Sequence, residues 1–109
     1  MITTHVLDTA TGRPGGGIAI ELERAGAGSD WALIGSGVTD DDGRLRTLTP
    51  SALDAGTYRI RFHTGPYFAA TGRPAFFPVV EIQFTVETGQ HYHVPLLVSP
   101  YGYTTYRGS

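Results

Sequence analysis

Apolar and polar residues alternate along three stretches of this chain, and this period of two constrains the fold more than any other feature. In residues 18–23, 58–63 and 80–86, every second residue is Val, Ile, Leu, Phe or Tyr, and most of the residues between them are charged or polar. A β-strand with one face on a core and the other in water has this period. The three stretches therefore predict half-buried strands.

Five less regular stretches are also expected to be strands: Ile2–Leu7, Trp31–Val38, Leu45–Leu48, Tyr92–Val98 and Gly102–Arg107. About eight short strands, separated by turn residues every 8–12 positions, are typical of an all-β sandwich or barrel.

Glycine, proline and aspartate mark the connections. Residues 11–17 contain four glycines and a proline and are expected to form a loop. Asp40–Gly43 and Asp54–Gly56 have the composition of tight turns. One short helix is expected within Gly65–Gly72, because Pro66 suits a first helical turn and Gly72 suits a stop.

Composition limits the chemistry that the chain can perform. With 109 residues, it is expected to form a single domain over residues 1–109. It has no cysteine and no lysine, which excludes a thiolate nucleophile and a lysine Schiff base. The net charge of −2 argues against nucleic acid as a partner. No apolar run is long enough to span a membrane, and no signal peptide is evident, so we expect a cytoplasmic protein.

Three histidines are candidates for a polar site. His5 is expected to point away from the core together with Thr3 and Leu7. His91 and His93 share one strand face, and such a pair can bind zinc when a third ligand, here His5, is close. Taken singly, each is more simply an ordinary surface histidine.

Three other features have ordinary interpretations when they are taken alone. Arg44 follows a turn, where an arginine is usually solvated, and Arg46 is expected to face solvent or to support Arg44. Pro95 lies within a predicted strand, which favours an edge strand, a bulge or a subunit contact. Residues 106–109 would by default be a frayed tail.

Four sequence blocks, in order, carry a resemblance to a known family. They span the whole chain with short gaps: Thr4–Asp8 with Thr11–Pro14, Asp42–Arg44, Phe76–Phe84, and His91–Ser109. The last block ends in Tyr-Arg-Gly-Ser. Together they resemble the transthyretin-like 5-hydroxyisourate hydrolases.

The resemblance implies a fold, an assembly and a reaction. The fold would be a transthyretin-like sandwich of two four-stranded antiparallel sheets with one short helix. The assembly would be a homotetramer, a dimer of dimers, with active sites in the channel where dimers meet. The reaction, in urate degradation, would hydrolyse 5-hydroxyisourate to 2-oxo-4-hydroxy-4-carboxy-5-ureidoimidazoline without a cofactor or metal.

The resemblance also implies functional residues. The family's catalytic residues match His5, Arg44 and His93. The substrate pocket would also be lined by the four terminal residues, Tyr106, Arg107, Gly108 and Ser109. Histidine suits proton transfer near neutral pH, and arginine suits a developing oxyanion. Which histidine is the general base stays open.

Two other functions compete with the hydrolase. A hormone carrier of the transthyretin type shares the fold but lacks the His5, Arg44 and His93 set and the Tyr-Arg-Gly-Ser end. A sugar-binding β-sandwich would use exposed aromatic residues as a platform, with these candidates: Trp31, Tyr58, Tyr67 and Tyr103. That alternative leaves the histidines and the terminus unexplained.

Overall fold

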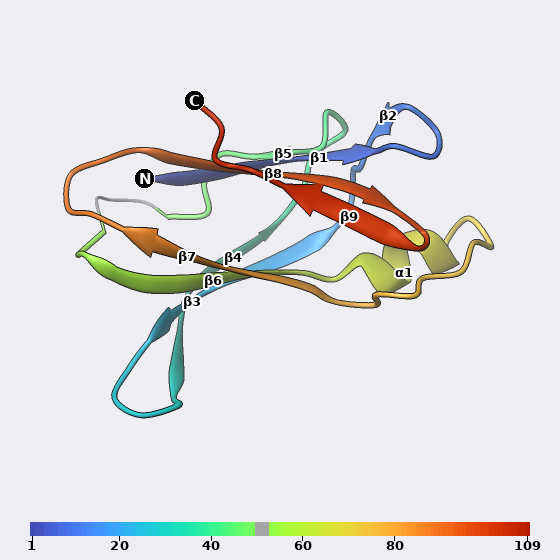
Figure 1. Cartoon of the computed structure of the whole chain (residues 1–109). Coiled ribbons are helices and arrows are strands. Elements are labelled where there is room, and N and C mark those ends of the chain that lie inside the picture. Colours follow the sequence, from blue (N-terminus) through green and yellow to red (C-terminus); the bar gives the residue numbers. More distant parts are fainter. Residues whose placement is uncertain (50–52) are drawn as a thin grey trace.

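The computed structural model of the chain describes residues 1–49 and 53–109, which form two β-sheets packed face to face with a short helix at one end (Figure 1). The elements are β1 (Ile2–Asp8), β2 (Arg13–Pro14), β3 (Ala19–Ala25), β4 (Trp31–Val38), β5 (Arg44–Leu45), β6 (Gly56–Phe62), α1 (Thr64–Ala69), β7 (Val80–Val86), β8 (Tyr92–Ser99) and β9 (Gly102–Thr105). Among the described residues, this confirms the expected sandwich of two sheets with one short helix.

One sheet differs from the expected four antiparallel strands. The four-stranded sheet has the order β4-β3-β6-β7 and is antiparallel throughout. The other has the order β2-β1-β8-β9, with β5 also paired to β1, and β1 runs parallel to β8. Alternation has the same period in both directions, so the pattern could not reveal this parallel pair.

Three predicted boundaries were wrong. The strand expected at Leu45–Leu48 is reduced to β5, which ends at Leu45. The strand expected at Gly102–Arg107 ends at Thr105. The loop expected at residues 11–17 contains the two-residue strand β2, which pairs with the end of β1. The helix prediction is confirmed, with α1 beginning one residue before the expected stretch.

The alternating apolar residues of both sheets form the core between them. The buried hydrophobic residues are Ile2, Val6, Ile18, Ile20, Leu22, Leu45, Leu48, Tyr58, Ile60, Phe62, Phe68, Val80, Ile82, Val86, Tyr92, Val94, Leu96 and Val98. Asp8, fully buried at the end of β1, accepts hydrogen bonds of 2.8 Å from the Tyr67 hydroxyl and from Arg73. This carboxylate therefore ties β1 to α1 and the loop after it.

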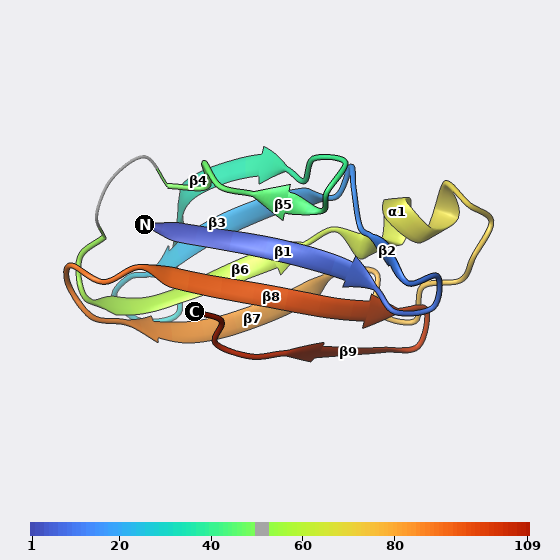
Figure 2. The ribbon, with the colours of Figure 1, turned by 90° about the horizontal axis from the view of Figure 1, so that it is seen from above.

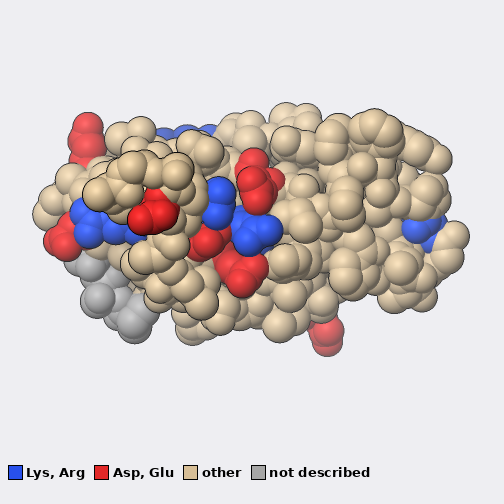
Figure 3. All heavy atoms as spheres, turned by 90° about the horizontal axis from the view of Figure 1, so that it is seen from below, with Lys and Arg blue, Asp and Glu red and all other residues tan. Residues whose placement is uncertain are grey.

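The outer face of the four-stranded sheet carries charges that neutralise one another. Arg59 lies 2.8 Å from Glu23, and Arg61 lies 2.9 Å from Glu81. Figure 3 shows these opposite charges gathered in the middle of that face. The candidate site lies on the other sheet.

Candidate active site

The outer face of the five-stranded sheet carries the histidines that the sequence singled out. In β1, Thr3 and His5 lie between buried residues and point outward, as predicted. β8 runs beside β1 with Thr3 opposite His93, whose neighbours Tyr92 and Val94 are buried. Figure 2 looks onto this face, where β5, β1, β8 and the end of the chain lie side by side.

A tight turn brings Arg44 to the same face. The Asp40 carboxylate accepts a backbone hydrogen bond of 2.9 Å from Arg44, which holds the pKa of Asp40 below its usual value. Gly43 has a φ of +75°, and a Cβ there would lie 2.4 Å from the carbonyl oxygen of Val6. Only glycine fits this turn. The resulting register sets Arg44 directly opposite His5.

A hollow of about 340 Å³ opens among these residues. Its lining consists of Met1, Thr3, Thr4, Arg44, Arg46, His91, His93 and Ser109. Two of the three predicted catalytic residues, Arg44 and His93, therefore face one space. The third, His5, is paired with Arg44 between β1 and β5 and is not among the residues that line the hollow.

A hydrogen bond between Nδ1 of His93 and the Thr3 hydroxyl holds the His93 ring. Its Nδ1 lies 2.8 Å from the hydroxyl oxygen of Thr3, and the same oxygen lies 3.4 Å from Nε2 of His91. Because Nδ1 is engaged, Nε2 is the ring nitrogen available to a substrate or water. The ring is thus oriented for proton transfer into the hollow.

The surroundings of His93 favour its neutral form. Burial of the ring lowers its pKa below the usual value, because the charged form loses hydration. Positive charges on His5, Arg44 and His91 lower the pKa further. A neutral imidazole is the form that accepts a proton, so His93 has the properties of a general base near pH 7.

Pro95 interrupts the pairing between β8 and β9. The register runs on from β9 to a bridge between His93 and Gly108, which places Pro95 opposite Tyr106. Proline has no N–H to donate, and β9 ends just before this pair, where the Thr105 hydroxyl donates to the Pro95 carbonyl at 2.8 Å. Since β8 lies between β1 and β9, the edge-strand interpretation of Pro95 is wrong.

Beyond this break, the end of the chain packs against His93. The Gly108 N–H donates to the His93 carbonyl at 2.8 Å. A Cβ on Gly108 would lie 2.6 Å from Cδ2 of the His93 ring, so a larger residue cannot occupy this place without a shift. Gly108 and Ser109 therefore lie at the candidate site, and the tail is not frayed.

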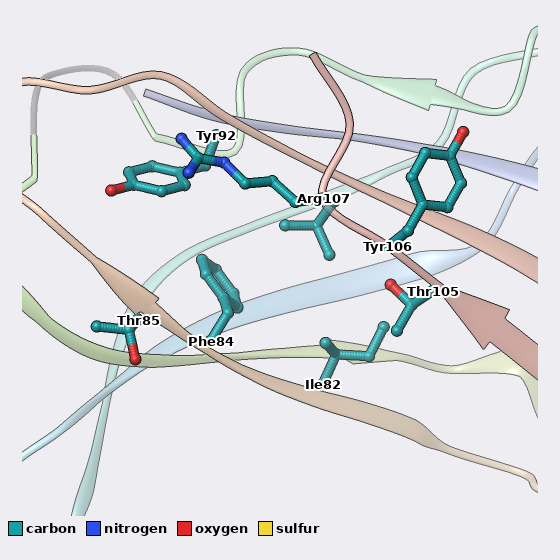
Figure 4. Close-up of a pocket in the computed structure, with 8 residues that line it drawn as sticks. Ile82, Phe84, Thr85, Tyr92, Thr105, Tyr106 and Arg107 are labelled. Carbon is teal, nitrogen blue, oxygen red and sulfur yellow. The ribbon is translucent and has the colours of Figure 1, made fainter.

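The Arg107 side chain points away from His93 and toward Tyr92. Its guanidinium lies 4.6 Å from the centre of the Tyr92 ring and donates to Gln90 at 3.1 Å. With Tyr106 it lines a second, mostly apolar hollow of about 260 Å³ between β7 and β9 (Figure 4). The Tyr106 hydroxyl projects away from that hollow into solvent (Figure 4). The structure therefore does not bring Arg107 to His93.

Within residues 1–49 and 53–109, no three His, Asp or Glu side chains are grouped closely enough to hold a metal ion. The zinc site considered for His5, His91 and His93 is thus not formed by these residues. In the same part of the chain, no helix is long and apolar enough to cross a membrane.

Thr3 and Arg46 line the hollow although neither was predicted as a site residue from the sequence. Thr3 was noted only as a neighbour of His5, although it pairs with His93 across the parallel strands. The signal was its outward position two residues before His5, but the pairing of β1 with β8 was needed to interpret it. Arg46 was expected to face solvent or to support Arg44, and it contributes to the lining of the hollow.

Comparisons with known proteins identify the family of the chain. A family model described as "HIUase/Transthyretin family" matches residues 2–108. The chain belongs to this family. It is 43% identical to the 5-hydroxyisourate hydrolase of Salmonella dublin, a match that covers 100% of this chain and 81% of that protein.

The solved structures that resemble this chain include a hydrolase and a thyroxine-bound transthyretin. The Klebsiella pneumoniae 5-hydroxyisourate hydrolase superposes with a TM-score of 0.88 and 38% identity, over 99% of this chain and 98% of that one. Sea bream transthyretin in complex with thyroxine gives a TM-score of 0.91 and 34% identity, over 98% and 93%. Because both structures superpose on this chain about equally well, membership of the HIUase/Transthyretin family alone does not distinguish hydrolysis from thyroxine binding.

Proposed function

We propose that this protein hydrolyses 5-hydroxyisourate to 2-oxo-4-hydroxy-4-carboxy-5-ureidoimidazoline. The observation that carries the proposal is the convergence of Arg44, His93 and Ser109 on one hollow, with His5 paired to Arg44 and Gly108 against the His93 ring. The names of relatives such as the Salmonella hydrolase support the same substrate.

The residues of the hollow suit the addition of water to a ring carbonyl. Nε2 of His93 takes a proton from water as the oxygen attacks the carbonyl carbon. Arg44 stabilises the negative charge that develops on the carbonyl oxygen, because its guanidinium stays charged and presents several donors. The C–N bond then breaks, and the ring nitrogen takes a proton as it leaves. His5, next to Arg44, is positioned to assist the proton transfers.

We assign the terminal tetrapeptide unequal roles. Gly108 and Ser109 contact the substrate region, since Ser109 lines the hollow. Tyr106 lies opposite Pro95, on the outward face of β8, and can approach a substrate from the side. We expect Arg107 to contribute to packing at Tyr92 and not to hydrolysis.

The proposed assembly is a homotetramer, a dimer of dimers. The hollow is open to solvent in the single chain, so a second copy facing it would close the site. β7 and β9 end their sheets on the same side of the sandwich and flank an apolar hollow, which suits contact with another copy. Light scattering should give the mass of a tetramer, whereas a fully active monomer would contradict this assembly. The cytoplasmic location expected from the sequence stays a prediction.

Spectrophotometry tests the activity directly. Freshly generated 5-hydroxyisourate decays spontaneously, so the protein must accelerate the decay beyond the buffer rate. The variants His5→Ala, Arg44→Ala and His93→Ala should each reduce turnover by about 10²-fold or more with the fold intact. The absence of acceleration at micromolar protein would refute the proposal, and full activity of His93→Ala would refute the assigned roles.

A carrier function is the second candidate, because the fold matches sea bream transthyretin in complex with thyroxine. Calorimetric titration with thyroxine separates the two functions. We expect no saturable binding, since the hollow is lined by arginine and histidine side chains. Tight binding together with no hydrolysis would favour the carrier.

A further inference from the structure

We infer that His91, Thr3 and His93 form a hydrogen-bonded chain that switches His93 between its base and acid forms during the reaction. The inference rests on the proposed function and extends it to two residues outside the assigned catalytic set. Thr3 and His91 line the hollow as well, but here they act as positioning residues, because their effect on the reaction passes through the His93 ring.

The fold brings these three side chains together. Thr3 is opposite His93 in the parallel register of β1 and β8, and both point outward. His91 lies two residues before His93, so the strand period places it on the same side. The Thr3 oxygen lies 2.8 Å from Nδ1 of His93 and 3.4 Å from Nε2 of His91.

A hydroxyl group has one proton, so its two hydrogen bonds are linked. When Thr3 donates to Nε2 of His91, it accepts from Nδ1–H of His93, and Nε2 of His93 is unprotonated. This is the base form. When His91 donates to Thr3, the Thr3 hydroxyl donates to Nδ1 of His93, and Nε2 of His93 carries the proton. This is the acid form. The state of His91 thus sets the tautomer of His93.

Proton transfer along the chain is balanced. In the first step, Nε2 of His93 takes a proton from the attacking water. The proton on Nδ1 then passes to Thr3, and the Thr3 proton passes to Nε2 of His91. His93 is left neutral with a proton on Nε2, and His91 is left as the cation. The reverse shift follows when Nε2 of His93 gives its proton to the leaving nitrogen.

The charges around His93 explain why the cation belongs on His91. His5 on β1 and Arg44 on β5 act on His93 with positive charge, and Arg46 lines the same hollow. A further positive charge, placed on the partly buried His93 ring, is therefore unfavourable. His91 is exposed to solvent, where water stabilises an imidazolium. Proton transfer along the hydrogen-bonded chain therefore moves the positive charge from His93, which lies among other cations, to solvent-exposed His91.

Two substitutions of Thr3 test the chain in the full-length protein. Thr3→Val keeps the β-branched shape and removes the hydroxyl, whereas Thr3→Ser keeps the hydroxyl. We expect Thr3→Val to lower kcat about 10- to 100-fold with KM within about twofold, because acid–base efficiency is lost while substrate contacts remain. Thr3→Ser should keep kcat within about threefold of the wild type, since its hydroxyl can make the same bonds.

Nitrogen-15 NMR of the imidazole rings reads the tautomers without any substrate. In the wild type and in Thr3→Ser, the state of His93 should change as His91 is protonated, and in Thr3→Val this coupling should disappear. His91→Gln should lower kcat and flatten the acid limb of its pH profile, with partial recovery in imidazole buffer. His63→Asn, on the other sheet, is the matched control and should change neither readout.

The outcomes separate the inference from the proposed function. A wild-type protein that fails to hydrolyse 5-hydroxyisourate refutes the function, and the NMR coupling still decides whether the chain exists. If Thr3→Val keeps both wild-type kcat and wild-type tautomer coupling, the hydrogen-bonded chain is refuted and the proposed hydrolase function is unaffected. Loss of coupling and of kcat in Thr3→Val, with retention of both in Thr3→Ser, supports it.

Discussion

Replacement of Gly108 by alanine should separate the role of the chain's end in the site from its role in stability. An added Cβ would lie 2.6 Å from Cδ2 of His93, whereas carbon atoms pack at about 3.5–4.0 Å. The ring or the tail must therefore move by about 1 Å. A misplacement of this size at a reacting group costs about 10²-fold in rate. We expect kcat of Gly108→Ala to fall by about that factor.

The same substitution should leave the fold nearly intact. The Gly108 N–H makes one hydrogen bond to His93, and a single such bond contributes about 1 kcal/mol. The free energy of unfolding, from urea titration, should therefore fall by about 1 kcal/mol or less. An unfolded or strongly destabilised variant would show that the tail does more than position His93.

Gly102→Ala is the matched control, six residues earlier in the same segment. A Cβ there would lie 3.8 Å from the Ser99 hydroxyl oxygen, which is an ordinary contact. This variant should keep kcat within about threefold of the wild type, because nothing near His93 moves. If Gly108→Ala and Gly102→Ala had equal kcat, and the His93 ring signals were unchanged in both, the steric reasoning would be refuted.

Four further predictions concern stability, pH and the tail. Asp8→Asn should lower the free energy of unfolding by about 2–3 kcal/mol, because the Arg73 guanidinium loses its charged partner. The control Asp54→Asn, at an exposed ion pair, should change the free energy of unfolding by less than about 0.5 kcal/mol. Burial raises the pKa of Asp8, but the hydrogen bonds from Arg73, Tyr67 and Thr11 together with the Arg73 charge outweigh it and lower the pKa. The contribution of Asp8 to stability is therefore present above about pH 3.9 and is lost as pH falls through the lower folded pKa, which urea midpoints across pH will show. Since the pKa of His93 is lowered and the base form is neutral, kcat/KM should rise with pH through a value below about 6.5 and hold above it. Arg107→Met should reduce stability by about 0.5–1 kcal/mol through loss of the ring contact and leave kcat nearly unchanged, whereas a large loss of kcat would return Arg107 to the substrate site.

The alternation of residue types was sufficient to predict an all-β sandwich or barrel, and the resemblance to a known family selected the sandwich. Half-buried strands have a period of two whatever their partners, so the strands at 18–23, 58–63 and 80–86 were predictable from sequence alone. The pattern carries no information on direction, and the parallel pairing of β1 with β8 could not be derived from it. That pairing is what sets Thr3 beside His93.

The site was predictable in part. The outward position of His5 followed from its buried neighbours on β1, and Arg44 was found through the motif around its turn. The terminal tetrapeptide was treated as one unit, although neighbouring residues of an extended segment point in opposite directions. This alternation sends Arg107 toward Tyr92 and leaves Gly108 against His93. A strand period applied to the tail would have found this division.

Stability and chemistry are carried by opposite faces of the same strands. The buried residues of β1 and β8 hold the sandwich together, and the residues between them form the candidate site. The fold superposes about equally well on a hydrolase and on a thyroxine-bound protein. The buried face that builds this fold therefore does not distinguish the two functions. Under the proposed function, we expect the distinction to rest on a few outward side chains, above all Arg44 and His93. Substitutions there should change what the hollow does and leave the free energy of unfolding close to that of the wild type.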